Sequence, residues 1–211
     1  MQSFIVKDGY GIIAACLAAA VILTSFGEPS WGTPFFALSL FMLFFFRNPA
    51  RALPKDDKAV FSPADGTVMD IADFIDHEYL DAEAKKITVF LSVFDVHVNR
   101  SPVRGEIKYQ SYTCGRFRPA YKSIASFENE RHAIGIENEK IKILVIQIAG
   151  ILARRIVSWV TLGHDLKQGQ RYGMIKFGSS TELIVPQNVR ILVKKGDKVK
   201  GGVTVMGRIE E

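Results

Sequence analysis

RYGMIKFGSSTELIVP, residues 171–186, shows the pattern that most of the chain repeats. On both sides of Gly178, apolar residues alternate with polar ones, which is typical of β-strands that bury one face. The hydroxyl residues Ser179 and Ser180 therefore lie between two expected strands rather than in a long linker. This stretch predicts a β-rich domain.

The Gly178-Ser179 pair is also the first candidate for chemistry. A Gly-Ser dipeptide between strands is most often a turn. Because glycine has no Cβ, the Ser179 hydroxyl could approach the Gly178 carbonyl and convert the amide into an ester. Elimination from that ester would cut the chain and leave dehydroalanine, which hydrolyses to a pyruvoyl group at the new N-terminus. The pair alone leaves both interpretations open.

Short alternating segments continue on the N-terminal side, back to about Val60, and on the C-terminal side to the end of the chain. Gly, Pro, Asn and Asp separate them, as in sandwiches and barrels. The expected strands lie in residues 61–71, 86–93, 105–113, 131–138, 140–149, 154–159, 172–177, 182–186, 189–194 and 203–209. The sequence predicts a mainly β fold, with a compact sandwich-like or barrel-like domain over residues 54–211.

A weak internal repeat supports this fold. GHDLKQG at residues 163–169 recurs as GDKVKGG at residues 196–202, and an apolar strand follows each copy. The glycines fit turns with positive φ, and the pattern is similar to the turns of biotinyl/lipoyl-like domains. We expect a duplicated β architecture.

Two apolar runs, residues 10–26 and 34–46, precede the β domain and contain no charged residue. GEPSWGT at residues 27–33 separates them. Each run is at or below the roughly 20 residues that cross a bilayer. We expect a membrane-associated helical hairpin within residues 1–53, and the sequence leaves open whether it spans the bilayer or is partly immersed.

The charges predict where the hairpin and the domain lie. Lys7 precedes the hairpin and Arg47 and Arg51 follow it, so both flanks are expected on the cytoplasmic side of the cell membrane. The chain has a net charge of +5, and the excess lies beyond residue 47, which suits an anionic membrane surface. It contains no basic run interleaved with aromatic residues, so nucleic acid is not an expected partner.

The cysteines and histidines argue against two further classes of protein, those held together by disulfides and those that bind a metal. The two cysteines, Cys16 and Cys114, do not form a disulfide framework, which favours a reducing compartment. The four histidines are scattered and form no ligand motif, so we expect no metal.

Three polar motifs interrupt the β pattern: SPADG at 62–66, FDVHVNRSP at 94–102 and NER at 129–131. An Asp before Gly, such as Asp65, is most often a turn residue, and a lone histidine after an apolar strand, such as His97, is most often structural. NER is consistent with a surface ion-pair cluster. Their joint occurrence with Gly178-Ser179 favours a catalytic interpretation.

In this order the motifs resemble the phosphatidylserine decarboxylases, especially their short prokaryotic form. The resemblance covers residues 45–211 and rests on FFFRNPAR (44–51), SPADG, FDVHVNRSP, NER, QIAGILARRIV (147–157) and GQRYGMIKFGS (169–179). It implies self-cleavage between Gly178 and Ser179 into a β chain, 1–178, and an α chain, 179–211. It also implies pyruvoyl-dependent decarboxylation of phosphatidylserine, or a related serine phospholipid, to phosphatidylethanolamine.

The resemblance implies roles for individual residues. Asp65 matches the family's aspartate, so Asp65, a histidine and Ser179 are expected to meet. Longer family members have a second histidine where this chain has Arg100. His97 is therefore the candidate both for the base in maturation and for the proton donor in turnover, with Asp65 orienting its imidazole.

Arg100, Arg116 and Lys122 are weaker candidates for holding a lipid phosphate. The sequence leaves open whether the protein forms a homo-oligomer. One alternative function is a membrane-anchored, non-catalytic carrier or adaptor with a biotinyl/lipoyl-like domain, although Lys176 lacks the Met-Lys-Met setting of an acylated lysine. Another is a pyruvoyl enzyme for a soluble amino acid, which would have no use for the apolar hairpin.

Overall fold

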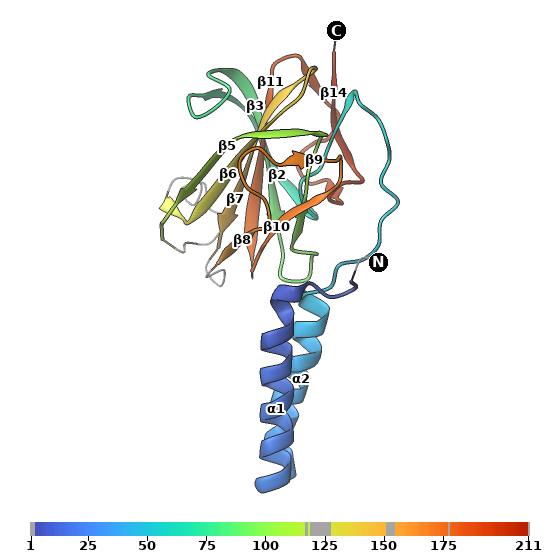
Figure 1. Ribbon diagram of the computed structural model, residues 1–211, viewed down its shortest axis with the longest axis vertical. Coiled ribbons are helices and arrows are strands. Elements are labelled where there is room, and N and C mark those ends of the chain that lie inside the picture. Colours follow the sequence, from blue (N-terminus) through green and yellow to red (C-terminus); the bar gives the residue numbers. More distant parts are fainter. Residues whose placement is uncertain (1–2, 117, 119–127, 151–154, 177, 211) are drawn as a thin grey trace. The chain divides into compact units, whose positions relative to one another are not determined.

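The computed structural model describes residues 3–116, 118, 128–150, 155–176 and 178–210 (Figure 1). The chain divides into two compact units, residues 1–50 and 51–211.

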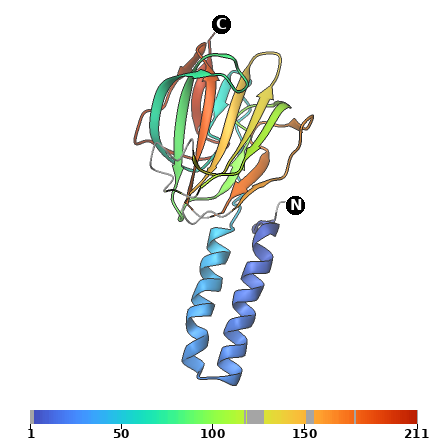
Figure 2. The same cartoon turned by 90° about the vertical axis from the view of Figure 1, so that its left-hand side faces the viewer.

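The first unit is an antiparallel pair of helices, which Figures 1 and 2 both show side by side. A short 3₁₀ turn, η1 (Lys7–Gly9), leads into α1 (Tyr10–Phe26), and α2 (Pro29–Phe45) follows. Residues 7–26 have a mean hydropathy of 2.0 and form the one described helix long and apolar enough to cross a membrane. The predicted apolar helical hairpin is therefore present.

The predicted break over residues 27–33 is too long, because only Gly27 and Glu28 separate the helices. A proline is tolerated in the first turn of a helix, where its missing N–H would have no intrahelical partner, so α2 begins at Pro29. Gly32 then lies inside α2, where an added Cβ would be 2.0 Å from Thr24 Oγ1. This glycine permits close approach of the two helices and does not mark a loop.

The second unit is built from antiparallel strands, which confirms the predicted mainly β fold. The strands are β1 (Ala59–Phe61), β2 (Gly66–Asp76), β3 (Ala82–Leu91), β4 (Val98–Arg100), β5 (Gly105–Thr113), β6 (Arg131–Glu137), β7 (Lys142–Ala149), β8 (Ile156–Ser158), β9 (Asp165–Leu166), β10 (Arg171–Ile175), β11 (Ser179–Pro186), β12 (Val189–Ile191), β13 (Lys198–Val199) and β14 (Val205–Ile209). Eight of them form a curled sheet in the order β13-β2-β3-β11-β7-β6-β5-β9. Two small sheets have the orders β1-β14-β12 and β4-β10-β8.

The sheet order contains an internal duplication, as the turn repeat predicts. The strand order of the large sheet is symmetric about the β11–β7 pair, so that β2 corresponds to β5, β3 to β6 and β13 to β9. The two small sheets, β1-β14-β12 and β4-β10-β8, correspond to each other in the same way. The two GxxxKxG turns carry the edge strands β9 and β13 at opposite ends of the large sheet. Their first and last glycines have φ of 81° and 71° in one copy and 95° and 72° in the other.

The duplication extends to SPADG (62–66) and SPVRG (101–105), a similarity that the sequence prediction did not include. The first serine of each motif donates to the carbonyl two residues later, at 2.7 Å for Ser62 and 2.6 Å for Ser101. The final glycines, Gly66 and Gly105, have φ of 156° and 157° and begin β2 and β5. The two motifs are therefore equivalent turns.

The second copy, β4 to β10, is inserted into the first between β3 and β11. We call β1–β3 with β11–β14 the host half, and β4–β10 the inserted half. The chain enters the inserted half through residues 92–97 and leaves it through residues 176–178. The predicted FDVHVNRSP and FGSS motifs thus overlap the two connections between the halves.

The core lies on the inner face of the large sheet. Along β11, Leu183 and Val185 belong to the main buried cluster, whereas Ile184 belongs to a second cluster on the other face. Since side chains alternate along a strand, Ser179 and Thr181 share the face of Leu183. The hydroxyl residues therefore belong to a buried strand, whereas the sequence prediction placed them between two strands.

Candidate catalytic site at the two connections between the halves

The two connections between the halves meet at His97 and Gly178. The backbone N–H of Gly178 donates to Nε2 of His97 at 3.3 Å, and the N–H of Ile175 donates to the His97 carbonyl at 3.3 Å. An inserted segment must leave the host close to where it entered, because β3 and β11 are neighbouring strands of one sheet. The structure thus brings the predicted histidine to the predicted scissile bond.

Gly178 has a φ of 56°, in the left-handed region that favours glycine. An added Cβ would have only Val93 Cγ1 near it, at 3.9 Å, so the backbone conformation and not crowding requires glycine here. Ser179 follows as the first residue of β11, paired with Leu91 on one side and Ala149 on the other. The chain therefore turns sharply immediately before a rigid, doubly paired strand.

The Ser179 side chain is fully buried, and its Oγ has no hydrogen-bond partner among the described residues. A buried hydroxyl is usually hydrogen bonded, since an unpaired polar atom costs free energy away from water. An unpaired buried hydroxyl beside a left-handed glycine and a histidine is a feature to be expected of a reacting group.

The imidazole of His97 is fully buried and its protonation pattern is set by its neighbours. Nδ1 lies 2.9 Å from the carbonyl oxygen of Asp95, which can only accept, so Nδ1 carries the proton. Nε2 then presents its lone pair to the Gly178 N–H. The ring is thus held in the tautomer that can take up a proton at Nε2, next to residues 178 and 179.

The structure does not bring Asp65 to the imidazole. The Asp65 carboxylate accepts two hydrogen bonds from Arg51, at 2.7 and 2.6 Å, and one from the Gly201 N–H at 2.8 Å. Among the described residues it makes no hydrogen bond to His97 or Ser179. Asp65 immediately precedes β2, and β3 lies between β2 and β11, so one whole strand separates the carboxylate from the Ser179 strand.

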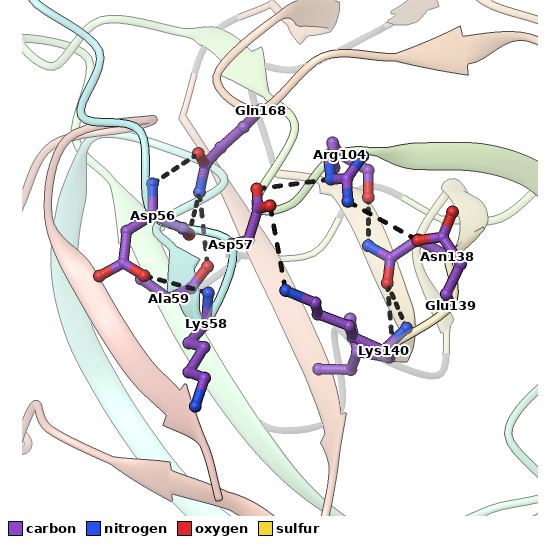
Figure 3. A network of polar contacts seen from close by, with 10 residues as sticks. Asp56, Asp57, Lys58, Ala59, Arg104, Asn138, Glu139, Lys140 and Gln168 are labelled. Atoms are coloured by element: carbon purple, nitrogen blue, oxygen red, sulfur yellow. Dashed lines mark hydrogen bonds and ion pairs between the residues drawn. The ribbon is translucent and has the colours of Figure 1, made fainter.

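The equivalent of Asp65 in the inserted half is Arg104, so the duplicated turns carry opposite charges. Arg104 lies 3.4 Å from Asp57 and 3.7 Å from Glu139, and Lys140 lies 3.9 Å from Asp57 (Figure 3). These side chains are about half exposed or more, so each pair contributes little by itself. Nearby, Gln168 exchanges hydrogen bonds with the backbone of Asp56. The segment 51–58 is thereby fixed to both halves.

The two described candidate phosphate ligands, Arg100 and Arg116, differ in burial and in contacts. Arg100 is 2% exposed and donates to the Gly169 carbonyl at 3.1 Å. Burial, together with the neighbouring charges of Arg51 and Arg171, lowers the pKa of Arg100 to about 10, so it remains a cation near neutral pH. Arg116 is exposed and 3.9 Å from Glu128. Lys122 lies outside the described residues, and phosphate binding by any of the three stays a prediction.

Asn129 and Glu130 of the NER motif are buried, so the interpretation of the motif as a surface ion-pair cluster is wrong for these two residues, whereas Arg131 is partly exposed and lies 3.7 Å from Glu78. The Asn129 amide donates to the Ala149 carbonyl at 2.6 Å, and Oε1 of Glu130 accepts from the Ile156 N–H at 3.1 Å. These contacts fix the chain around the end of β7, whose last residue, Ala149, pairs with Ser179. The charged residues of the motif suggested a solvent-exposed cluster, but the Asn129 and Glu130 side chains bind backbone groups at a strand end.

A buried polar row next to Ser179 has no counterpart in the sequence prediction. Thr181, Gln147 and His132 lie directly opposite one another on the adjacent strands β11, β7 and β6. Asn99 of β4 joins the row by donating to Thr181 Oγ1 at 3.3 Å and accepting from Gln147 Nε2 at 2.7 Å. Gln147 was detectable in the sequence, because it occupies an inward position of an otherwise apolar strand.

Comparison with known proteins places these features in context. The family model described as phosphatidylserine decarboxylase matches residues 38–207. A protein of Carboxydothermus hydrogenoformans named phosphatidylserine decarboxylase proenzyme is 53% identical over 205 residues, which cover 97% of this chain and 96% of that protein. A protein of the same name from Symbiobacterium thermophilum is 41% identical over 211 residues, which cover 100% and 98% of the two chains. One from Geotalea uraniireducens is 40% identical over 204 residues, which cover 96% and 95%.

Proposed function

The chain belongs to the phosphatidylserine decarboxylase family, and from this membership we propose that it is a precursor that cleaves itself between Gly178 and Ser179 and then decarboxylates phosphatidylserine. The name proenzyme, carried by its relatives, supports processing of a precursor. Family membership also disfavours the non-catalytic carrier or adaptor. The observation that carries the proposal is the contact between His97 Nε2 and the Gly178 N–H, beside a buried Ser179 Oγ without a hydrogen-bond partner in the described part of the chain.

The first chemical step joins Ser179 Oγ to the carbonyl carbon of Gly178. We assign to His97 Nε2 the role of accepting the hydroxyl proton, because its lone pair accepts from the N–H of Gly178, the residue that directly precedes Ser179. The C–N bond between the residues breaks, the released nitrogen takes a proton, and the amide has become an ester. Left-handed Gly178 supports this step, since its backbone is already displaced from the extended conformation of the strand.

In the second step the ester is eliminated. The Cα proton of Ser179 is removed and the Cβ–Oγ bond breaks, which releases Gly178 as a free carboxylate. The dehydroalanine left at residue 179 takes up water and loses ammonia, which leaves a pyruvoyl group. Residues 1–178 become the β chain and residues 179–211 the α chain. One water is consumed and one ammonia is released in the two steps together.

The residues around position 179 fit a pyruvoyl group. Position 179 is buried and doubly paired, so a ketone there would be shielded from water and rigidly held. A pyruvoyl group supplies a carbonyl electron sink for the electrons left behind by departing CO2. We assign to His97 the delivery of a proton to the substrate α carbon, because it is a buried titratable group hydrogen bonded to Gly178, the residue before position 179.

We keep Asp65 among the proposed catalytic residues because it matches the family's aspartate. In the uncleaved chain its carboxylate is bound to Arg51 and Gly201. Orientation of the imidazole by Asp65 therefore requires the carboxylate to exchange these partners for His97. If that exchange does not occur, Asp65 acts by holding Arg51 and the 196–202 turn in place.

The substrate we propose is phosphatidylserine or a closely related serine phospholipid, and the product is the ethanolamine lipid. The apolar helix over residues 7–26 supports attachment to a membrane, where such a lipid resides. Lys7 and Arg47, at the two ends of the hairpin, support a cytoplasmic location for the β domain. Arg100 and Arg116 are the described candidates for the lipid phosphate, with Lys122 outside the described residues.

Intact mass of the purified protein tests the proposal. We expect two chains that separate under denaturing conditions, with the smaller one beginning at residue 179 and bearing a keto-acyl end instead of an amine. Ser179→Ala should remain one chain and release no CO2 from phosphatidylserine. The matched control is Ser180→Ala, which removes the adjacent buried hydroxyl and should still be cleaved. A fully active preparation that consists only of the 23.5 kDa chain would refute self-cleavage.

A further inference from the structure

The buried polar row beside the cleavage site connects the strand that follows His97 to the strand that begins with Ser179. His97 immediately precedes β4, and Ser179 is the first residue of β11. The backbone of β4 pairs with β10, in the small sheet, and among the described strands it has no ladder with β11. Side chains must therefore set the separation of these two strands.

Two hydrogen bonds from this segment span that separation. One joins His97 to the Gly178 N–H, and two residues further along the chain Asn99 donates to Thr181 Oγ1 at 3.3 Å. The hydrogen bond between Asn99 and Thr181 therefore lies next to the contact between His97 and Gly178, where the reaction is proposed to occur. A shift of β4 relative to β11 would change both contacts together.

Asn99 is itself held from the other side by a continuous chain of hydrogen bonds. Gln147 Nε2 donates to Asn99 Oδ1 at 2.7 Å, and Gln147 Oε1 lies 3.1 Å from Nδ1 of His132. Nε2 of His132 lies 2.9 Å from the amide nitrogen of Gln110, which also reaches the Val160 carbonyl at 3.4 Å. The row therefore runs from β5 through β6 and β7 to β4 and β11.

The Val160 carbonyl sets the direction of this row, because it can only accept and therefore faces the amide nitrogen of Gln110. Because Gln147 uses its amide nitrogen on Asn99, its oxygen must accept, so His132 carries its proton on Nδ1. Nε2 of His132 then accepts from Gln110. Burial lowers the pKa of His132, which favours this neutral form. Each amide has one orientation that satisfies its neighbours, so the row is a rigid spacer.

We propose that Asn99, Gln147 and His132 are positioning residues for self-cleavage, and that through Thr181 they hold β4 against β11 and thereby place His97 beside the Gly178-Ser179 bond. The inference rests on the proposed function and extends it to residues that do not touch the reacting atoms. A buried hydrogen-bond network loses its geometry when one member is removed. A displacement of about 1 Å at a reacting group can slow a reaction about 100-fold.

The decisive variant is Thr181→Val, which keeps the shape of the side chain and removes the acceptor for Asn99. The full-length precursor is made by cell-free translation, and its conversion to two chains is followed over time on a denaturing gel. We expect Thr181→Val to be cleaved about 10- to 100-fold more slowly than the wild-type chain. Thr181→Ser, which restores the hydroxyl, should return the rate to near the wild-type value.

The matched control is Thr204→Val, which removes a hydroxyl that caps the Lys200 N–H in a turn outside the row. It should be cleaved at the wild-type rate. Melting temperatures of uncleavable Ser179→Ala versions of all variants separate positioning from general destabilisation. If Thr181→Val does not fold, the double variant His132→Leu with Gln147→Met replaces two mutually bonded partners by apolar side chains and should slow cleavage in the same way.

If the wild-type chain is cleaved, and Thr181→Val or the folded double variant is cleaved at the same rate, this inference is overturned and the proposed function stays intact. A loss of rate that Thr181→Ser does not restore would also overturn it, since the hydroxyl would then not be the cause. A wild-type chain that stays whole under all conditions would overturn the proposed function, and this inference with it.

Discussion

The backbone N–H of Gly178 and Nε2 of His97 are hydrogen bonded at 3.3 Å although 81 positions separate the two residues in the chain. The contact exists because a whole half of the β unit, β4 to β10, is inserted between β3 and β11. The two ends of that insertion lie side by side, and each carries one partner of the contact. A duplicated fold has thus placed a base and a scissile bond at the junction of its copies.

His97→Gln tests the role of the imidazole in maturation. Glutamine can still accept a hydrogen bond from the Gly178 N–H, but it cannot take up the Ser179 proton near neutral pH. We expect self-cleavage to slow by at least about 100-fold, which is within the usual range for loss of a general base. The conversion of the full-length chain on denaturing gels measures this. Cleavage at the wild-type rate would show that the proton goes elsewhere.

Asp65→Asn tests the ion pair that Asp65 forms in the uncleaved chain. The side chains of Arg51 and Asp65 are only 9% and 14% exposed, so removal of one charge leaves the other poorly solvated. We expect the free energy of unfolding to fall by about 1–3 kcal/mol, which is less than for a fully buried pair because water still reaches both groups.

Glu210→Gln is the control for the ion pair. It breaks the pair between Arg190 and Glu210, whose side chains are 64% and 57% exposed, and should change the free energy of unfolding by less than about 1 kcal/mol. Urea titrations of both variants on the Ser179→Ala background measure the difference. Equal effects of the two substitutions would mean that the Arg51–Asp65 pair is no stronger than a surface pair.

The buried imidazole of His132 predicts a pH dependence of stability. Burial disfavours its charged form, so its pKa in the folded chain is below the ordinary value of about 6.5. As the pH falls below about 6.5, the unfolded chain binds a proton that the folded chain does not, and the unfolding free energy decreases. The contribution of His132 to the unfolding free energy is complete above that pH and is lost on acidification. The unfolding free energy then falls by at most about 1.4 kcal/mol per pH unit.

His132→Asn should remove this part of the acid-induced loss of stability. His164→Asn, which removes an exposed imidazole, serves as the matched control. Unfolding free energies of the uncleavable Ser179→Ala chain and of both variants on that background, measured between pH 5 and 8, provide the comparison. An undiminished slope in His132→Asn would contradict the assignment of the slope to this residue.

The apolar hairpin predicts that the substrate is a lipid in a membrane. We expect CO2 release from phosphatidylserine in vesicles and little or none from free serine at the same serine concentration. Removal of residues 1–46 should slow turnover on vesicles more than turnover on detergent-dispersed lipid. Equal rates with free serine and with the lipid would instead favour the pyruvoyl enzyme for a soluble amino acid.

Local patterns in the sequence were sufficient for much of this fold. Period-2 alternation located the longer strands but missed the short strands β4, β9 and β13, and it merged β1 with the start of β2. The repeated glycines of the 163–169 and 196–202 turns indicated a duplication, which agrees with the symmetric strand order. These features depend on backbone geometry within a few residues, so they can be seen in one segment at a time. The Gly178-Ser179 pair is likewise a candidate for chemistry by its residue types and by its place between two alternating segments.

The partners of the functional residues depended on the tertiary structure. Asp65 appeared as a triad member, but its carboxylate binds Arg51, because β3 lies between its strand and the Ser179 strand. The Thr181, Gln147 and Asn99 contacts require the register of β11 against β7 and the packing of a three-residue strand over both. Sequence spacing sets which face of a strand a side chain occupies. Which side chain lies opposite is decided only when strands far apart in the chain are paired, since one residue of slippage would change every partner.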